Sequence, residues 1–284
     1  MKTVAIATLL EVAVLIGPQC AYAQTVPAAG AETPQAQQGE APKPKEEAPK
    51  HVSTGWHALF KDTVRDFKSF PMRPSTWVIL GIGTGASFGT HYADDYVQEH
   101  IVGNKNAERF FSLGKVVGSS YVMAASSVGL WAVGRYVIGP SADGSKTNKW
   151  SEMGFDMMRA QILAQSITQG TKKIARRDRP TGECCSFPSG HAASAFAAAA
   201  VLERHLGYRG SLPFFAGALY VGASRLVDNR HFLSDVMFGA AVGTASGWTV
   251  VGRHGNNPIT MQPVPVDHGI MIAMTRAPRY AAGS

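Results

Sequence analysis

The sequence predicts an all-α protein, a bundle of about six helices with its functional site at one end. Apolar residues recur at helical spacing in the segment 56–70, an alanine-rich run with high helix propensity follows Gly190, and glycines four residues apart mark two further helices. No segment gives a convincing signal for a central sheet. With 284 residues and 45% hydrophobic content, the chain can bury one good core.

The two ends of the chain differ from this helical domain, which is expected to span 51–258. Residues 1–23 have the form of an export signal, with Lys2, an apolar run and Ala21-Tyr22-Ala23 before the expected cleavage point. An uncut membrane anchor is disfavoured because the apolar run is shorter than the ~20 residues that a span needs. Residues 24–50 are rich in proline and polar residues and predict a disordered linker. Residues 259–284 form a tail, with a strand pair or another ordered structure left open.

Four helical segments have patterns that allow specific interpretations. The amphipathic segment 56–70 is either a membrane-surface helix or a helix packed on its own domain. The uncharged segment 116–134 is the best candidate for a membrane span. In the segment 77–90, a glycine face predicts close packing against another helix, and the same spacing recurs in 236–252. These glycines are Gly81, Gly85 and Gly89 in the first case and Gly239, Gly243 and Gly247 in the second.

The net charge of the chain indicates which kinds of partner it can bind. The formal net charge of +7 favours anionic partners such as phosphates or an anionic membrane surface. Nucleic acid is disfavoured because no recognisable binding motif is present and an export signal is expected.

The adjacent pair Cys184-Cys185 forms either a vicinal disulfide, a bond to another chain or two packed thiols, and no chemistry is assigned to it. The cluster of His91, Asp94 and Asp95 is interpreted as exposed helix-capping residues rather than a metal site.

The strongest functional signal surrounds a turn that leads into a helix. Pro188 and Gly190 mark the turn, and Ser189 is a good N-cap for the alanine-rich helix that follows. The first backbone N–H groups of such a helix form a ready anion site. Charged and catalytic residue types stand on both sides of this turn at defined distances: Lys172, Arg179, His191, Arg225, His231 and Asp235.

Together these residues form three motifs, Lys-x6-Arg-Pro, Pro-Ser-Gly-His and Ser-Arg-x5-His-x3-Asp, in that order. This set resembles the signature of the type 2 phosphatidic acid phosphatase family, whose site is shared with vanadium haloperoxidases. The motifs cover 172–235, under a quarter of the chain. The resemblance implies an all-helical fold in which the three motifs meet at one end. The loop between the first two motifs, 181–187, is shorter than in many family members.

Metal-independent phosphate-ester hydrolysis needs such a mixture of charges and titratable groups, and each residue type has a role in it. Lys172, Arg179 and Arg225 could surround the phosphoryl oxygens, with Ser189 and the Gly190 backbone N–H completing the cradle. His231 and Asp235 are four residues apart, which predicts that they are stacked on one helix face.

In this scheme His231 is the nucleophile, oriented by Asp235, and forms a phosphohistidine. His191 protonates the leaving alcohol and then activates water. The mechanism requires His231 to be neutral and His191 to be protonated, so a bell-shaped pH profile with a neutral to mildly acidic optimum is expected. The family resemblance implies the same roles.

The sequence therefore predicts a phosphatase for phosphate monoesters or pyrophosphates, with a lipid or a soluble organic phosphate as substrate and no cofactor. The first alternative is a haloperoxidase in which the same residues bind vanadate. The second is a non-catalytic, anion-binding protein of the cell envelope. The expected location is the periplasm or the periplasmic face of a membrane, with membrane association favoured.

Overall fold

The computed structural model describes residues 53–139, 147–252, 259–266 and 269–276. The predicted export signal and linker lie outside the described residues. The described helices are α1 (Trp56–Met72), α2 (Pro74–His91), α3 (Asp94–Ile101), α4 (Lys105–Phe111), α5 (Gly114–Val117), α6 (Ser120–Ala132), the π-helix η1 (Val133–Val137), α7 (Lys149–Ala175), α8 (Gly190–Val227) and α9 (Leu233–Val251). Of these, six have 13 or more residues, namely α1, α2, α6, α7, α8 and α9. The prediction of an all-α bundle with about six helices is confirmed.

Two strands follow the helices, β1 (Ile259–Val266) and β2 (Gly269–Arg276). They form an antiparallel pair in which Ile259 lies opposite Arg276 and Val266 lies opposite Gly269. The two strands make up one two-stranded sheet.

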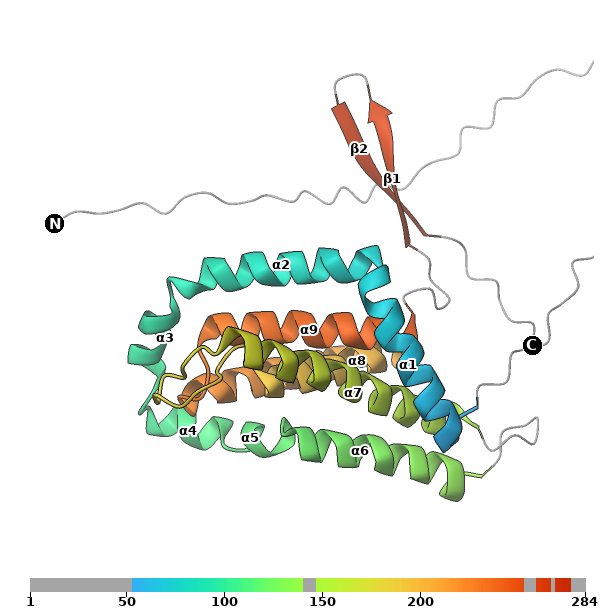
Figure 1. Ribbon diagram of the computed structural model, residues 1–284, viewed down its shortest axis with the longest axis horizontal. Helices are drawn as coiled ribbons and strands as arrows, with labels where there is room; N and C mark the ends of the chain where they lie inside the picture. Colours follow the sequence, from blue (N-terminus) through green and yellow to red (C-terminus); the bar gives the residue numbers. More distant parts are fainter. Residues whose placement is uncertain (1–52, 140–146, 253–258, 267–268, 277–284) are drawn as a thin grey trace, which may run out of the picture. The chain divides into compact units, whose positions relative to one another are not determined.

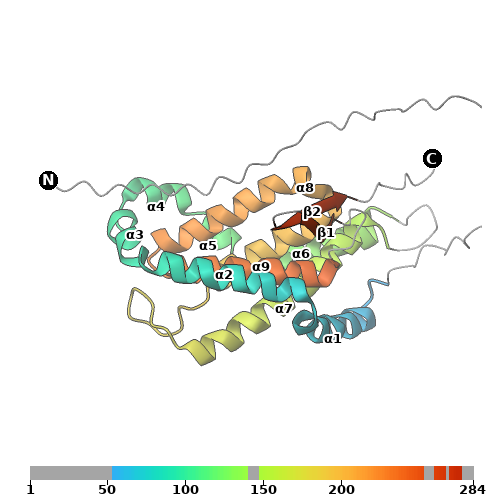
Figure 2. The ribbon, with the colours of Figure 1, turned by 90° about the horizontal axis from the view of Figure 1, so that it is seen from above.

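The centre of the bundle is the contact between α8 and α9, with α7 beside them (Figures 1 and 2). A Cβ atom added at Gly239 would lie 2.5 Å from the Ser189 carbonyl oxygen, and one at Gly243 would lie 2.3 Å from that of Ala193. Only glycine allows the two backbones to approach this closely, so the predicted close packing of the 236–252 glycine face is confirmed. Because α9 lies against the first turns of α8, this contact also fixes the position of the functional site.

The corresponding prediction for α2 is wrong. Added Cβ atoms at Gly81, Gly85 and Gly89 would have no atom within 4 Å, so this face does not pack closely on another helix. The close contact of α2 is made at Gly83, where a Cβ atom would lie 2.2 Å from the Cβ of Ala241 on α9. Residues that are two apart in an α-helix lie on nearly opposite sides of it, so Gly83 faces away from Gly81 and Gly85. The regular glycine spacing therefore identified the wrong side of α2 as the packing face.

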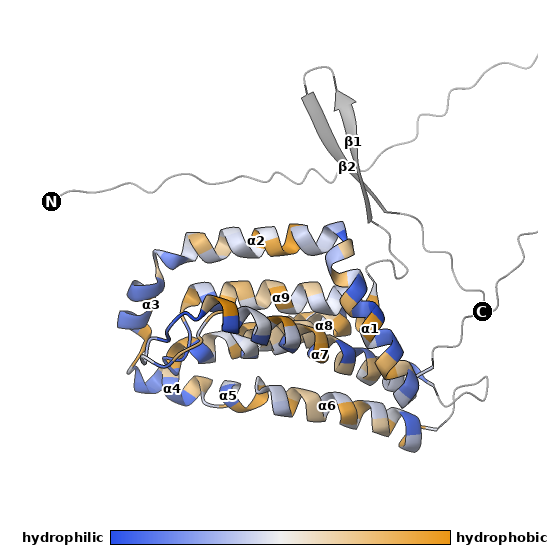
Figure 3. Cartoon of the chain, in the orientation of Figure 1, coloured by the Kyte–Doolittle hydropathy of each residue, from blue (hydrophilic) through white to orange (hydrophobic). Residues whose placement is uncertain are grey.

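The candidate membrane span at 116–134 is not one helix. The chain leaves α5 at Gly118, and the Ser119 side chain caps α6 by accepting a hydrogen bond from the Val122 N–H at 3.3 Å. Across the part of the chain that the structure describes, we find no helix with both the length and the apolar character needed to cross a bilayer. Figure 3 shows hydrophobic residues along α8 and α9 and hydrophilic residues on α3 and α4.

Helix α1 packs on α7, but its pattern of exposure differs from that of a simple amphipathic helix. Trp56 and Phe60 are 67% and 75% exposed, whereas Asp66 is buried at 3%. Asp66 is buried because Arg159 on α7 donates two hydrogen bonds to its carboxylate, both at 2.8 Å. Arg159 also donates to Asp156 at 2.9 Å, and His205 on α8 lies 3.0 Å from the other oxygen of Asp156. We call these four residues the structural charge cluster.

Candidate active site

All eight residues predicted from the motifs lie at one end of the bundle, where the loop 176–189 joins α7 to α8 near α3 and α4 (Figure 1). Six of them line a single cavity of about 370 Å³: Lys172, Arg179, Gly190, His191, Arg225 and His231. The other two, Ser189 and Asp235, lie behind this lining and position it. The cavity is also lined by Ser120, Gln165, Gln169 and Arg230, which the motifs did not indicate.

The first turn of α8 is built as an anion site. Ser189 is its N-cap and accepts a hydrogen bond from the Ala192 N–H at 3.4 Å, while the Ala193 N–H donates to the Ser189 carbonyl at 3.0 Å. The N–H groups of Gly190 and His191 precede these bonds and are therefore available to a ligand. The Ser189 N–H donates to the Asp235 carbonyl at 3.0 Å, which ties the start of α8 to α9.

His231 and Asp235 are brought together, but not on one helix face as expected. Helix α9 begins at Leu233, after His231, because the Asp235 carboxylate caps it by accepting a hydrogen bond from the Phe232 N–H at 2.9 Å. The His231 Nδ1 lies 3.6 Å from Asp235 Oδ2, at ion-pair distance but beyond a normal hydrogen bond. Burial lowers the pKa of His231, although the Asp235 carboxylate acts in the opposite direction. The neutral state expected for His231 is therefore favoured.

Asp235 is completely buried and is held ionised by its neighbours. Burial alone would raise its pKa, but the adjacent His231 ring, the hydrogen bonds donated by Ser186 and the Phe232 N–H, and the positive charge of Arg177 lower it. The Ser186 hydroxyl donates to one carboxylate oxygen, and Arg177 donates to the other at 2.8 Å. The carboxylate is thus fixed in charge and in position behind the His231 ring.

His191 differs from the expectation that it is protonated. Burial, followed by the positive charge of Arg225 and the nearby His231, lowers the pKa of His191 to about 4. In the ligand-free site His191 is therefore neutral at neutral pH. A bound phosphate would bring negative charge next to the same cations, which would raise the pKa of His191 again.

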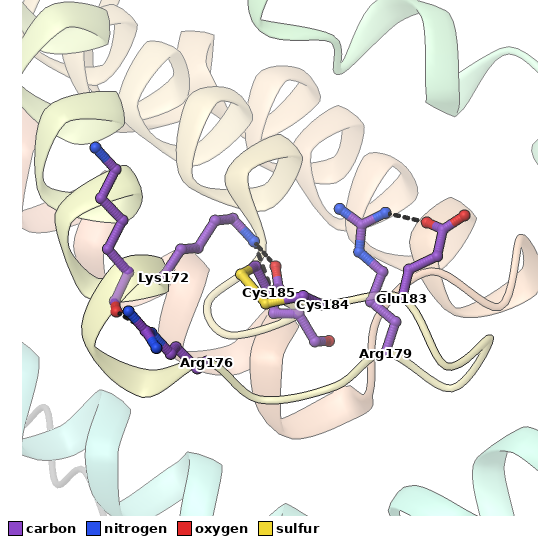
Figure 4. Close-up of a disulfide and its surroundings, with 8 residues drawn as sticks. Lys172, Arg176, Arg179, Glu183, Cys184 and Cys185 are labelled. Carbon is purple, nitrogen blue, oxygen red and sulfur yellow. Dashed lines mark hydrogen bonds and ion pairs between the residues drawn. A yellow bond between two sulfur atoms is a disulfide. The ribbon is translucent and has the colours of Figure 1, made fainter.

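Lys172 reaches the loop before α8 from the last turns of α7. Its Nζ donates to the carbonyl oxygens of Cys185 at 2.6 Å and Ser186 at 3.0 Å (Figure 4). Burial and the positive charge of Arg179 lower the pKa of Lys172 to about 8. Cys184 and Cys185 are joined by a disulfide, so of the states that the sequence left open the structure has the vicinal ring. This ring belongs to the same loop that positions Lys172.

Of the two arginines of the cradle, Arg225 is buried and Arg179 is partly exposed, and neither guanidinium has all of its nitrogens hydrogen-bonded. Arg179 donates to Glu183 at 2.9 Å, and Arg225 donates to Asp228 at 2.9 Å. Within the described residues, Nε of each arginine and Nδ1 of His231 are buried without a hydrogen-bond partner. Buried polar atoms in this state are rare in native proteins. His231 Nδ1 faces Asp235, whereas the two guanidinium nitrogens belong to residues that line one cavity and point to an anionic ligand.

A second group of residues holds Asp235 and was not identified from the sequence. Arg177 bridges Asp235, at 2.8 Å, and Asp94, at 2.9 Å. Asp94 in turn accepts hydrogen bonds from the backbone N–H and the hydroxyl of Ser234, at 2.9 and 2.6 Å. The Arg177 guanidinium also lies 4.1 Å from the centre of the Phe232 ring. These contacts connect α3 to the start of α9 directly behind the His231–Asp235 pair.

The interpretation of His91, Asp94 and Asp95 as exposed capping residues is wrong for Asp94, which is only 2% exposed. Asp94 caps α9 by accepting a hydrogen bond from the Ser234 N–H. Because α9 is distant from Asp94 in the sequence, the local sequence pattern could not reveal this capping role. Gln165 was also missed: its Nε2 donates to the Gly190 carbonyl at 2.9 Å. Gln165 lies two helical turns before Lys172 on the same side of α7, and this spacing was an available signal.

The fold and the site define a helical-bundle protein with a cationic, histidine-containing cavity at one end of the bundle. Residues 154–258 match the family model of the PAP2 superfamily. This segment contains all three motifs. The resemblance seen in the motifs is therefore confirmed by the match of this segment to the family model.

One curated relative is a lipid A 1-phosphatase from Porphyromonas gingivalis, which is 37% identical over 108 residues. The match covers 36% of this chain and 24% of the relative. The chain thus spans about a quarter of the length of that protein.

Two solved structures are similar in fold. A transmembrane PAP2-type phosphatidylglycerolphosphate phosphatase from Bacillus subtilis aligns with a TM-score of 0.50 and 21% identity, over 63% of this chain and 93% of that one. LpxE from Aquifex aeolicus aligns with a TM-score of 0.45 and 22% identity, over 55% of this chain and 90% of that one. The first of these likenesses supports the helical fold.

Proposed function

We propose that this protein is a phosphatase that hydrolyses phosphate monoesters or pyrophosphates through a phosphohistidine at His231. The observation that carries the proposal is the pair of buried, unpartnered guanidinium nitrogens, Nε of Arg179 and Nε of Arg225, beside the cavity that Lys172 and His231 also line. Phosphoryl transfer depends mainly on positioning and on stabilising the charge of the phosphoryl oxygens. The match of residues 154–258 to the PAP2 superfamily model and the similarity to a lipid A 1-phosphatase support the same class of activity.

The geometry supports a specific order of events. The Nδ1 of His231 faces Asp235, which leaves Nε2 for attack on phosphorus. The phosphorus–oxygen bond of the ester breaks, and the leaving oxygen takes a proton from His191. Water then attacks the phosphohistidine, His191 accepts its proton, and inorganic phosphate is released.

The proton that His191 needs can arrive with the substrate. Since the pKa of His191 in the free site is about 4, the free protein holds His191 neutral. A phosphate monoester has a second pKa near ~6, so its monoanion can bring this proton into the cavity. The optimum for a monoester is therefore expected on the acidic side of neutrality.

A chelator-treated preparation should be tested for phosphate release from a panel of lipid and water-soluble phosphoesters. The proposal expects turnover that orthovanadate inhibits, because vanadate occupies the same cradle as phosphate. Halide oxidation that requires vanadate and peroxide, without phosphate release, would contradict the proposal and favour the haloperoxidase alternative.

We further propose a lipid phosphate as substrate and a location on the periplasmic face of a membrane. The export signal expected at 1–23 motivates the location. Large apolar side chains of α1 and α2 are exposed, among them Trp56, Trp77 and Phe88 at 67%, 61% and 71%, and such residues favour a membrane surface. Cell fractionation tests this: protein that remains in the periplasmic fraction at low salt, without membranes, would contradict the membrane part of the proposal.

A further inference from the structure

Gln165 on α7 lines the His231 cavity, and its amide is held in one orientation. Its Nε2 donates to the Gly190 carbonyl at 2.9 Å and to the Ser194 hydroxyl at 2.6 Å, both on α8. A carbonyl oxygen can only accept, so the amide nitrogen, not the amide oxygen, must face Gly190. The two bonds use both hydrogens of the nitrogen. The amide oxygen Oε1 accepts no hydrogen bond from any residue that the structure describes.

The free Oε1 lies beside the first residue of α8. A Cβ atom added at Gly190 would lie 3.5 Å from Oε1 and 3.7 Å from Nε2. A side chain at position 190 would therefore cover the amide, whereas glycine leaves it uncovered. The next residue is His191, which lines the same cavity. Gln165 and His191 thus reach this cavity from two helices that are hydrogen-bonded to each other at Gly190.

The cavity has many hydrogen-bond donors and few fixed acceptors. Four of its lining side chains are cations that only donate hydrogen bonds, namely Lys172, Arg179, Arg225 and Arg230. Such groups suit the oxygens of a phosphoryl group, but they cannot accept a hydrogen bond from water. Apart from the histidines, the lining side chains that can accept are those of Ser120, Gln165 and Gln169. Of these three, Gln165 is the one that hydrogen bonds to α8 hold in place.

The second step of the proposed reaction has a use for a fixed acceptor. A water molecule has two O–H groups, and His191 takes the proton of one of them when the water attacks the phosphohistidine. We propose that Gln165 Oε1 accepts a hydrogen bond from the other O–H group and so positions the water for attack on the phosphorus held by His231. This inference rests on the proposed function and assigns a further residue to its second step.

Each bond and proton of that step has a place. The water oxygen forms a bond to phosphorus while the bond between phosphorus and His231 Nε2 breaks, and the electron pair of that bond returns to Nε2. One water proton moves to His191, and the other stays on the oxygen that leaves as part of inorganic phosphate. Because α8 fixes the Gln165 amide before the water arrives, the acceptor does not have to reorient during the reaction.

The main test compares water with methanol as the acceptor of the phosphoryl group, using the full chain. Methanol has a single O–H group, which it gives to His191, so its attack does not require Gln165. With p-nitrophenyl phosphate as substrate and methanol added, Gln165→Leu should raise the ratio of methyl phosphate to inorganic phosphate by about tenfold or more over the wild type. A variant that only distorts the site slows both reactions and leaves this ratio unchanged.

A rapid-quench measurement without methanol gives a second readout. Gln165→Leu should release p-nitrophenol in a burst that is stoichiometric with active sites, because its first step is largely intact. The turnover that follows should be about 10- to 100-fold slower than in the wild type, and labelled phosphohistidine should accumulate. Gln165→Met, whose side chain has a similar length, takes the place of the leucine variant if that variant does not fold.

Gln161→Leu is a matched control on the same helix. Gln161 lies one turn before Gln165, donates to the Ser194 carbonyl at 2.9 Å and lines neither this cavity nor the neighbouring one. Its loss should leave the product ratio within about twofold of the wild type and should produce no burst.

Two results would overturn the role of Gln165 while leaving the phosphatase proposal intact. One is a wild-type product ratio in the Gln165 variants, and the other is slower p-nitrophenol release with no burst, which would place the defect in the first step. Absence of both phosphohistidine and phosphate release in the wild type would instead contradict the proposed function, and this inference with it.

Discussion

The candidate active site and the structural charge cluster both bury charged groups between helices, but they satisfy those groups differently. In the structural charge cluster every guanidinium nitrogen of Arg159 has a carboxylate oxygen within 2.9 Å. In the active site, Nε of Arg179 and Nε of Arg225 have no partner within the described residues. A satisfied cluster joins helices, whereas an unsatisfied one is preorganised for a ligand. The comparison separates residues that hold the fold from residues that act on a substrate.

The largest expected contrast is between two histidines that both lie next to an aspartate. His231→Asn should reduce phosphate release by at least about a thousandfold, because the nucleophile is lost. His205→Asn should retain kcat within about threefold and lower the free energy of unfolding by about 1–2 kcal/mol, because Asp156 loses one of its two partners and keeps Arg159. Steady-state kinetics and urea unfolding of both variants measure the contrast. Equal effects on activity would remove the distinction between the two regions.

The two buried arginines extend the comparison to cations. Arg225→Met should lower kcat/KM by about 100-fold or more, as expected for loss of a group that stabilises the phosphoryl oxygens, with little change in stability. Arg159→Met should destabilise the fold by about 3–5 kcal/mol, because it leaves Asp66 and Asp156 buried without their shared cation. Thermal unfolding and activity per folded molecule test both variants. Destabilisation of the Arg225 variant by a similar amount would contradict the view that its charge is kept for the ligand.

Arg177 lies between these two classes, since it is a positioning residue that contacts Asp235 and Asp94 but does not line the cavity. Arg177→Lys should keep much of the stability and reduce kcat by about 10- to 100-fold with a smaller change in KM, because the Asp235 carboxylate is no longer held from both sides. Arg177→Met should lose both activity and stability. If the lysine variant is as unstable as the methionine variant, Arg177 has a structural role alone.

The smallest expected effect is a change in pH dependence. The pKa of Lys172 is about 8, well below its ordinary value, so its positive charge is present below pH 8 and is lost above it. For the free protein, kcat/KM should therefore fall as the pH rises through about 8. Lys172→Arg keeps its charge at all these pH values, so this alkaline limb should move upward by more than one pH unit. An unchanged limb in the arginine variant would show that another group causes it.

The sequence predicted the site better than it predicted the contacts around the site. The motif spacing identified six residues that line one cavity, because such spacing records which side chains must meet at a substrate. It failed for the His231–Asp235 geometry, since Asp235 caps α9 and so excludes His231 from the helix. It also failed for Asp94, whose partners Arg177 and Ser234 lie far away in the sequence.

Prediction of the helix contacts from glycine spacing had the same limitation. The four-residue spacing in α9 correctly predicted close contact with α8, but the same spacing in α2 marks a face with no close neighbour. Periodicity shows that residues share a face, whereas which face meets a partner depends on the packing of the other helices. The structural charge cluster was missed for a similar reason, because Asp66 and Arg159 belong to different helices and neither has a distinctive local pattern.

The most direct test of this account is to trap the covalent intermediate. The wild type and the variants His231→Asn and His191→Asn would be mixed with a substrate whose terminal phosphate is labelled, then quenched in base, where phosphohistidine is stable. Peptide mass spectrometry would locate the label. The account predicts phosphate on His231 in the wild type, more of it in the His191 variant, whose intermediate is hydrolysed slowly, and none in the His231 variant. Label on another residue, or turnover by the His231 variant at the wild-type rate, would contradict it.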